Sequence, residues 1–187
     1  MKKICKESKN AQMINQADKR IMIVGCPASG KTTFARLLGS LIGREIIHLD
    51  KILWKPNWEE MPYEQRKKIH DTLIQEDEWL IEGMWRSHVA DRIERATKVY
   101  FLDYSTMRCK FNALTRWFTY YGKQRSDMQV GCLEKIDKDF WHYISTFNKV
   151  VRPYLLELFE KNLNVEIVTF KSPKQAVNYL TKLSKKI

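Results

Sequence analysis

Short apolar runs alternate along the chain with longer stretches in which apolar residues recur every three or four positions. The first pattern predicts buried strands, and the second predicts amphipathic helices. Strands are expected at 21–24, 45–50, 79–82, 99–103 and 165–170. Near-continuous apolar strands separated by helices are typical of a parallel sheet covered on both faces, so we expect a three-layer α/β fold.

The helical pattern is clear directly after the first strand, where Phe34, Leu37, Leu38 and Leu41 would share one helix face. Pro62 stands immediately before a second such pattern, in a position that proline favours at the start of a helix. Pro153 falls inside the longest helical stretch and predicts a kink or a break there. The expected helices are 33–42, 63–75, 86–95, 106–121, 133–162 and one that begins at Pro173.

The length of 187 residues suits a single domain. Residues 1–19 show no apolar period, so we expect a flexible basic extension followed by one domain over 20–187. No stretch approaches the roughly 20 apolar residues that span a bilayer, and no apolar stretch of a secretory signal follows the basic start. We therefore expect a cytoplasmic protein, and a monomer or a homodimer.

The formal net charge is +11, and basic residues gather at both ends of the chain. Residues 1–20 hold six lysines or arginines against two acids, and residues 171–187 hold five lysines and no acid. Such charge either attracts anionic substrates or nucleic acid, or forms a solvated surface without a partner. We favour the solvated surface at the two ends, because lysine runs alone are weak evidence for nucleic-acid binding.

One segment carries the most specific motif in the sequence. Gly25–Thr32 fits G-x-x-x-x-G-K-[ST], with an expected strand before it and an expected helix after it. In this arrangement, called a P-loop, successive backbone N–H groups point at an anion, and the start of the next helix adds partial positive charge. The motif predicts ATP binding through the residues Gly25, Pro27, Ala28, Ser29, Gly30, Lys31, Thr32 and Thr33.

Within the motif, we expect Lys31 to reach the β- and γ-phosphates and the Thr32 hydroxyl to ligate Mg²⁺. We expect free thiols in a reducing compartment. The thiol of Cys26 would lie beside the same N–H groups, which could lower its pKa and make it sensitive to oxidation, and this is the less favoured alternative. The four cysteines show no C-x-x-C spacing, so neither a zinc site nor a redox motif is predicted.

Three acidic residues stand at the ends of expected strands, namely Asp50, Glu82 and Asp103. Ligands of parallel α/β folds bind at the carboxyl ends of strands, so these residues are candidates for holding Mg²⁺ or for orienting an acceptor hydroxyl. The alternative for each is a turn residue or a helix N-cap. That alternative is strongest for Asp103, which directly precedes an expected helix.

Arginines recur after the third and fourth strands, as Arg86, Arg108, Arg116 and Arg125. Phosphoryl transfer depends mainly on positioning and on stabilisation of charge, so guanidinium groups near the phosphates are expected. Arg116 and Arg125 are the stronger candidates for stabilising developing charge. The alternative is that these arginines are solvated on a helix surface.

Aromatic residues gather in two segments, Trp54–Trp58 and Trp117–Tyr121. The first directly follows Asp50 and could stack on a base or cap a ring, or could form a small core of its own. Trp141 and Tyr143 are expected in the core.

Five segments together resemble a known family. They are Gly25–Thr32, His48–Asp50, Leu53–Trp58, Trp79–Arg86 and Phe101–Asp103. The chain from about residue 20 to about residue 180 is similar in these segments to the bacterial DNA topology modulation proteins, which are P-loop proteins related to adenylate kinase. The resemblance implies a five-stranded parallel sheet in the order 2-3-1-4-5 and a short lid around 105–130.

The resemblance also implies roles for individual residues. Adenylate kinases end the third strand in Asp-Gly-x-x-Arg, so Glu82 would stand near Mg²⁺ and Arg86 would clamp the acceptor. Glu in place of Asp lengthens the arm by one methylene and leaves direct ligation of the metal open. Asp50 would bind the acceptor, and Arg116 and Arg125 would act as lid arginines. The segment 170–173 would contact the adenine.

These features predict an ATP-binding P-loop protein, and most simply a small nucleotide or metabolite kinase that uses ATP and Mg²⁺. Asp50 favours a hydroxyl acceptor and Arg86 favours a phosphorylated acceptor, so the acceptor stays open. The alternative is an ATP-dependent, nucleic-acid-associated regulator of DNA topology, to which the charge of +11 points. A polynucleotide 5′-hydroxyl kinase would unite both features, although no motif supports it.

Overall fold

The computed structural model describes residues 18–123 and 127–186 of the chain. Within these residues, five strands form one sheet in which every neighbouring pair is parallel, in the order β2-β3-β1-β4-β5. The predicted α/β class and strand order are therefore confirmed. The strands are β1 (Arg20–Gly25), β2 (Ile47–His48), β3 (Trp79–Glu82), β4 (Lys98–Leu102) and β5 (Glu166–Phe170).

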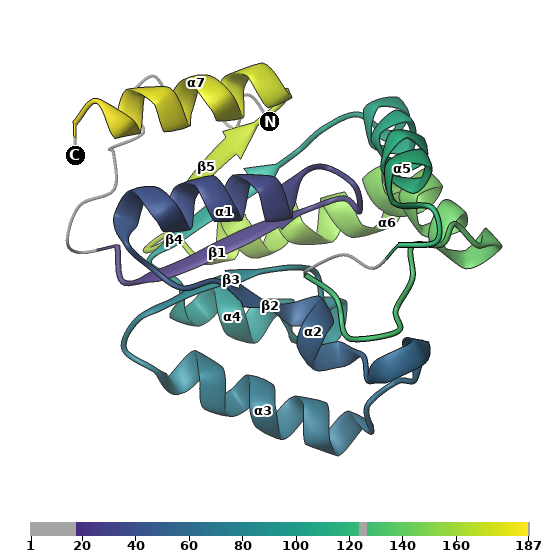
Figure 1. The fold of residues 1–187 in the computed structure, drawn as a ribbon. Helices are drawn as coiled ribbons and strands as arrows, with labels where there is room; N and C mark the ends of the chain where they lie inside the picture. The colour runs from purple at the N-terminus through teal and green to yellow at the C-terminus, as the bar shows by residue number, and fades with distance from the viewer. Residues whose placement is uncertain (1–17, 124–126, 187) are drawn as a thin grey trace.

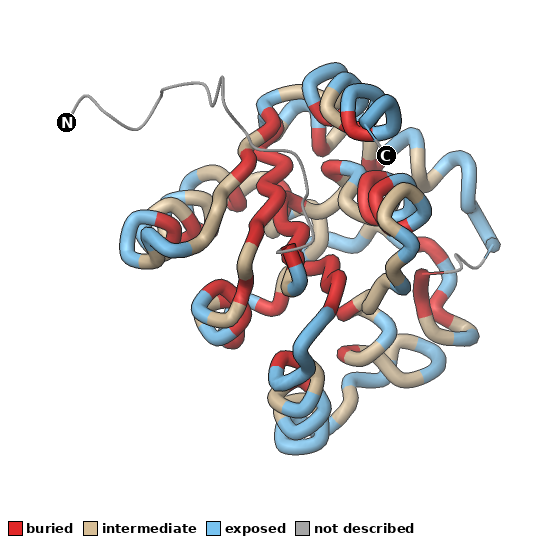
Figure 2. Tube along the Cα trace, turned by 90° about the vertical axis from the view of Figure 1, so that its left-hand side faces the viewer, coloured by how far each residue is buried: buried red, intermediate tan, exposed pale blue. Residues whose placement is uncertain are grey.

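Burial is greatest along the three central strands. All four residues from Ile21 to Val24 in β1 are 0% exposed, and β3 and β4 are buried along their whole length. Figure 2 shows these strands as a continuous buried strip through the middle of the molecule, while the outer helices are exposed on one side. A central strand covered on both faces must be apolar throughout, which explains the continuous apolar runs in the sequence.

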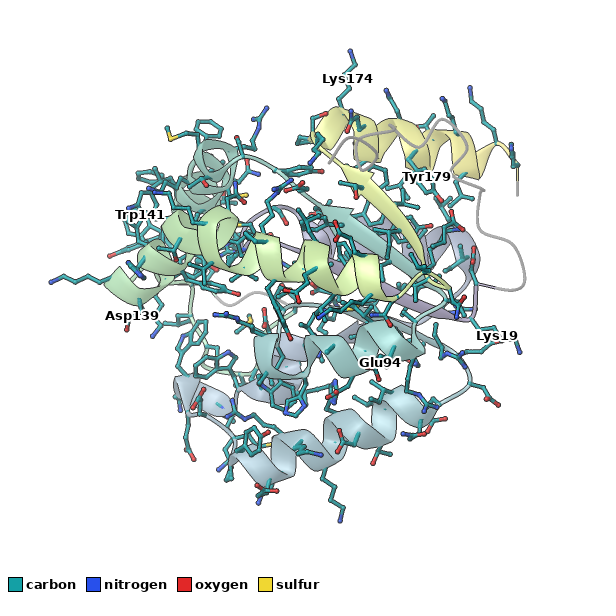
Figure 3. All side chains as sticks on the ribbon, turned by 180° about the vertical axis from the view of Figure 1, so that it is seen from behind. Lys19, Glu94, Asp139, Trp141, Lys174 and Tyr179 are labelled. Atoms are coloured by element: carbon teal, nitrogen blue, oxygen red, sulfur yellow. The ribbon has the colours of Figure 1, made fainter. Side chains whose placement is uncertain are left out.

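Helices cover both faces of the sheet (Figure 1). On one face α1 (Lys31–Ile42) contacts β1 and β3 and packs beside α7 (Pro173–Ser184). On the other face α4 (Val89–Arg95) contacts β1 and packs beside α6 (Lys138–Lys161), as the view from behind in Figure 3 also shows. The short α2 (Leu49–Leu53) and the longer α3 (Tyr63–Gln75) pack together beyond the β2 edge.

Several predicted boundaries differ from the structure. The second strand is only two residues long, because Leu49 and Asp50 already belong to α2. The segment 86–95 is divided into a 3₁₀ turn, η2 (Arg86–His88), and α4. The longest helix begins at Lys138 instead of 133, where the side chain of Asp137 caps it by accepting a hydrogen bond from the Phe140 N–H at 2.8 Å.

Pro153 neither ends nor divides this longest helix, which continues to Lys161. A proline in a helix leaves the carbonyl four residues earlier without its N–H donor. Pro153 lies on the exposed side of α6, so water can satisfy that carbonyl and the helix survives the loss.

Helix α5 (Thr106–Tyr120) follows the carboxyl end of β4 and packs against α6. It is followed by residues 127–137, here called the 127–137 segment, which returns the chain to the start of α6. No helix within the described ranges combines the length and the apolar character that crossing a membrane requires.

Candidate functional site

The Gly25–Thr32 loop joins the carboxyl end of β1 to the start of α1. A Cβ atom on Gly25 would stand 2.6 Å from the Leu102 carbonyl oxygen, so only glycine allows β4 to approach this closely. Gly30 has φ +89° and faces open space, with no atom within 4 Å of a Cβ built there. The loop is therefore packed against the sheet at its beginning and open at its end.

The open end of the loop presents hydrogen-bond donors. Gly30 is the N-cap of α1 and offers no side-chain acceptor to the first turn of the helix. The first N–H groups of any helix lack acceptors within it, so they are available to an anion. Ser29 Oγ is buried and has no hydrogen-bond partner among the described atoms, which is the kind of orphaned group that a ligand satisfies.

The ammonium group of Lys31 folds back over the same loop. Its Nζ donates to the carbonyl oxygens of Gly25 at 3.1 Å and of Cys26 at 3.0 Å. These two bonds hold a positive charge above the open donors of the loop. A bound anion would therefore meet both the helix N-terminus and a lysine.

Two carboxylates converge on the hydroxyl of Thr32. The hydroxyl lies 3.0 Å from Glu82 Oε1 at the end of β3 and 3.2 Å from Asp127 Oδ2 in the 127–137 segment. A hydroxyl has one proton, so it cannot fully satisfy both carboxylates at once. His48 Nδ1 also lies 2.8 Å from Glu82 Oε1 and fixes that carboxylate. One hydroxyl and two carboxylates form an oxygen donor set of the kind that Mg²⁺ prefers.

The loop opens into a cavity of about 820 Å³. Helix α1 and the loop form one wall, α5 and the 127–137 segment form a second, and residues that follow β2 and β3 form a third. Its size lies within the range of small-molecule sites. Trp54, Trp58, Phe140 and Tyr143 give the cavity aromatic walls.

The 127–137 segment, which forms one wall of the cavity, is held in place by hydrogen bonds to the chain around the two tryptophans. Gln129 Nε2 donates to the Lys51 carbonyl at 2.7 Å, and Trp58 Nε1 donates to the Leu133 carbonyl at 3.0 Å. The Asn57 N–H donates to the Val130 carbonyl at 3.3 Å. The site is thus assembled from segments that are more than seventy residues apart in the sequence.

Backbone strain gathers at the same place. Within the described residues, the non-glycine residues with positive φ are Ala28, Asn57 and Trp58, at 58°, 60° and 63°. Ala28 and Trp58 line the cavity, and Asn57 directly precedes Trp58 in the chain. Such conformations are costly and concentrate at functional sites.

Most of the predicted loop residues line this cavity. They are Pro27, Ala28, Gly30, Lys31, Thr32 and Thr33, together with the predicted metal ligand Glu82. Asp50 also lines it, although from α2 rather than from the end of a strand. Gly25 and Ser29 are not among the residues that line it.

The predicted arginines divide among three situations. Arg116 lines the cavity, and its guanidinium is bound to Glu134, with Nε and NH2 lying 2.8 Å and 2.7 Å from Oε1. Arg86 is exposed, does not line the cavity, and lies over the Tyr154 ring at 5.8 Å. Arg125 falls outside the described residues.

Asp103 is neither a helix cap nor part of the cavity wall. Ser105 caps α5, and Asp103 accepts hydrogen bonds from Arg152, at 2.7 Å and 3.0 Å, and from Lys171. Burial alone would raise the pKa of Asp103, but these bonds outweigh it and hold the pKa below its usual value. The segment 170–173 does not line the cavity either, and Lys171 in it is bound to Asp103.

The less favoured alternative of an acidic, oxidation-sensitive thiol at Cys26 is contradicted by the structure. The hydrogen bond between Cys26 and Cys109, together with burial, raises the pKa of the Cys26 thiol. The side chain is 1% exposed and points away from the open donors of the loop into the core. A buried thiol with a raised pKa behaves as a small apolar side chain.

The aromatic segments also differ in their placement. Trp54 and Trp58 meet edge to face with ring centroids 5.3 Å apart, and both line the cavity. Tyr143, predicted in the core, lines the cavity as well, and burial raises its pKa to about 12. Trp141 is half-buried near the start of α6 (Figure 3), below the ammonium of Lys110.

Sequence reasoning missed Asp127, Arg36 and Glu134. Asp127 approaches Thr32 and Arg36 from a segment with no regular period, so no spacing rule places it at the site. Glu134 was part of an expected helix, where an acidic residue is usually solvated. No local signal in either stretch could have found these residues.

A second group of ligand-type side chains lies away from the cavity. Among the described residues, His70, His88 and Asp91 alone bring three potential metal-ligand atoms within 4.8 Å of one another. His70 Nε2 lies 3.1 Å from the guanidinium of the buried Arg92, and His88 Nε2 lies 2.9 Å from the Tyr63 hydroxyl. Since the ring nitrogens are already engaged and a buried cation is adjacent, we assign the group to packing between α3 and α4.

In comparisons with known proteins, no family model matches this chain and no curated protein matches it either. The functional argument therefore rests on the geometry of the cavity and on general chemistry.

Proposed function

We propose that this chain is a P-loop kinase that binds ATP with Mg²⁺ and transfers the γ-phosphoryl group to a small acceptor. One observation carries the proposal. The Gly25–Thr32 loop lies at the carboxyl edge of a parallel sheet and opens, with unused donors and a lysine, into a cavity. In folds of this kind ligands bind at that edge, and phosphates bind at such helix N-termini.

The residues around the loop fit the two groups that the proposal needs. The N–H groups of the loop and Lys31 would hold the phosphates, and the bonds from Lys31 to the loop carbonyls would be exchanged for bonds to phosphate oxygens. Thr32, Glu82 and Asp127 would hold Mg²⁺ directly or through water. When bound, Mg²⁺ supplies charge neutralisation at the reacting phosphate.

The remaining wall of the cavity can bind and activate an acceptor. Asp50 can accept a hydrogen bond from an acceptor hydroxyl and take up its proton. Trp54, Trp58 and the 127–137 segment cover the cavity and would limit the entry of water, which would otherwise compete as an acceptor. This arrangement supports phosphoryl transfer over simple hydrolysis of ATP.

Isothermal titration calorimetry with Mg-ATP tests the binding step of the proposal, and ADP release from Mg-ATP in the presence of an acceptor tests the transfer step. We expect the unaltered protein to bind Mg-ATP, and we expect Lys31→Ala to lower phosphoryl transfer by about 10²–10³-fold, because a charge that stabilises the transferring group is lost. Lys174→Ala is the matched control, since Lys174 is an exposed lysine on α7 (Figure 3). Absence of binding by the unaltered protein would refute the proposal.

A nucleic-acid-associated role is a second candidate, favoured by one observation. Five lysines, all exposed, lie in the last part of the described chain, and the net charge is +11. The five are Lys171, Lys174, Lys182, Lys185 and Lys186. Affinity for duplex DNA that falls steeply with the logarithm of salt concentration would support this role. Absence of binding at low salt would exclude it.

A further inference from the structure

The acceptor side of the cavity has a composition that restricts its substrate. We define this acceptor half as Asp50, Trp54, Trp58, Met84 and Tyr143, which lie beyond β2 and β3 or on α6. It lies next to the Gly25–Thr32 loop, so a molecule bound there would stand beside the proposed position of the γ-phosphate. The inference rests on the kinase activity proposed above.

Carboxylates outnumber cations on the described cavity wall, six to four. The carboxylates are Asp50, Glu82, Asp127, Glu134, Asp137 and Asp139, and the cations are Lys31, Arg36, Arg116 and Lys135. Lys31 and Arg36 belong to the α1 side, where the triphosphate is proposed to bind. Arg116 and Lys135 are therefore the described cations left for an acceptor.

Arg116 is committed to Glu134. The Glu134 side chain is 4% exposed, and both Nε and NH2 of Arg116 approach its Oε1. Moving Arg116 to an acceptor phosphate would break its ion pair with this buried carboxylate, which is unfavourable. Arg116 is thus a structural partner of the 127–137 segment rather than a ready phosphate clamp.

Lys135 is also engaged, and its position is informative. Its ammonium lies 3.1 Å from Asp137 and 4.9 Å from the centroid of the Trp58 ring. An ammonium group is therefore accommodated at this side of the cavity, between a carboxylate and an indole face. Attraction between a cation and an aromatic face is a recurrent way of recognising amines.

Two arginines outside the cavity wall, Arg86 and Arg152, also have partners that would compete with an acceptor phosphate. Arg86 lies over Tyr154, and Arg152 makes two hydrogen bonds to Asp103. A phosphate carried by the acceptor would meet a described cavity wall on which carboxylates outnumber cations, and the arginines of that wall, Arg36 and Arg116, each pair with a carboxylate. Like charges at short range in a partly desolvated cavity repel strongly.

We infer that the acceptor is a hydroxyl compound that carries a protonated amino group and no phosphate, as amino sugars and amino alcohols do. The amino group is bound by the carboxylate of Asp139 at the rim and by the indole rings of the acceptor half, and the hydroxyl faces Asp50. In the transfer step the hydroxyl oxygen bonds to the γ-phosphorus, and its proton passes to Asp50. The bond from the γ-phosphorus to the bridging oxygen breaks, and its electron pair leaves with ADP.

The experiment compares matched acceptors on the full chain. Glucosamine, kanamycin and ethanolamine are the amino-bearing probes, glucose and adenosine are neutral probes, and glucose 6-phosphate and AMP are phosphorylated probes. Binding is measured by calorimetry in the presence of Mg²⁺ and a non-hydrolysable ATP analogue, and transfer is measured by ADP release with Mg-ATP. We expect at least one amino-bearing probe to bind and to raise ADP release about tenfold or more over its neutral and phosphorylated counterparts.

A charge reversal at the rim provides the second test. Asp139 lines the cavity and is exposed, so Asp139→Lys should leave the fold intact. It is expected to weaken binding of the amino-bearing probe about tenfold and to leave binding of the neutral probe unchanged. Asp77→Lys, at an exposed position outside the cavity, is the matched control and should change neither.

The outcomes separate this inference from the proposed kinase activity. Better transfer to AMP or glucose 6-phosphate would overturn the inference and support the kinase. Mg-ATP binding without transfer to any amino-bearing probe would also overturn it. Failure to bind Mg-ATP at all would refute the proposed function itself, and the inference would fall with it.

Discussion

Charged side chains are buried at both ends of the strands of the central sheet, the amino ends (here the amino edge) and the carboxyl ends (the carboxyl edge). Their surroundings differ between the two. At the amino edge, Lys98 is fully buried and pairs with Asp18 at 2.7 Å and with Glu166 at 3.0 Å. At the carboxyl edge, Glu82 and Asp127 converge on one hydroxyl beside an open cavity. In the first group the ammonium of Lys98 is closed to solvent, whereas the second group faces a volume that a ligand can enter.

The pKa of Lys98 reflects how strongly its buried ammonium group is paired. Burial alone would lower this pKa, but the hydrogen bonds to Asp18 and Glu166 outweigh burial and raise it above its usual value. At the carboxyl ends of the strands, Glu82 is bound to Thr32 and His48, and Asp127 is bound to Thr32 and Arg36, beside a cavity that a ligand can enter. Burial of charge by itself therefore does not mark a functional site, whereas carboxylates that converge beside a cavity indicate one.

The largest expected effect tests the closed edge. Lys98→Met leaves Asp18 without its ammonium partner and is expected to lower the free energy of unfolding by about 3 kcal/mol. For a chain of this length the melting temperature should fall by about 6–12 °C, as measured by calorimetry. Mg-ATP affinity should not change, and Lys182→Met, at an exposed lysine of α7, should change neither quantity. Loss of Mg-ATP binding without loss of stability would contradict the comparison.

The open edge should show the reverse behaviour. Asp127→Asn removes one of the two carboxylates around Thr32 and is expected to raise the Mg²⁺ concentration needed for half-maximal activity by about 10–100-fold. The melting temperature should stay the same or rise, because repulsion between the carboxylates is relieved. A magnesium titration of activity and a thermal melt measure the two effects, with Asp77→Asn as the control. A large loss of stability would show instead that Asp127 belongs to a closed group.

A third, closed group should respond to pH. Burial, and then the nearby charge of Arg92, lower the pKa of His70 below 6.5, and hydrogen bonding to Asp71 opposes this only in part. The unfolded chain then binds more protons than the folded chain between the folded pKa and 6.5, so stability falls as the pH drops through that window. Above pH 6.5 the contribution is fully present. His70→Gln should give a shallower decline of the unfolding free energy from pH 6.5 downward in denaturant titrations, and an equal decline would contradict the assignment.

The smallest effect is expected at Arg86. Its side chain is exposed and lies outside the cavity, so Arg86→Gln should change stability by about 0.5 kcal/mol or less and kcat/KM by about twofold or less. Steady-state kinetics with the best acceptor found above measures this. A tenfold fall in kcat/KM would place Arg86 at the reacting groups, as the sequence resemblance implies.

Features with a local signature could be predicted from the sequence. The Gly25–Thr32 loop was found because its spacing and its flanking strand and helix are contiguous in the chain. Glu82 was found because it ends an apolar strand, and ligands gather at strand ends. Asp103 ends a strand in the same way, yet Arg152 and Lys171, which neutralise it, come from distant parts of the chain. Strand-end position therefore nominated both residues and could not separate them.

The sequence by itself determined the parallel α/β sheet and the placement of the loop at the carboxyl ends of its strands, because apolar period and motif spacing are properties of neighbouring residues. The strand order was implied only by the resemblance to a known family. Tertiary structure alone decided that Asp127 joins Glu82 at Thr32, that Arg116 is bound by Glu134, and that Arg86 stays outside the cavity. These outcomes depend on which side chains meet across large separations in sequence. Their energies arise from pairing and desolvation at the point of contact, and no local pattern encodes that point.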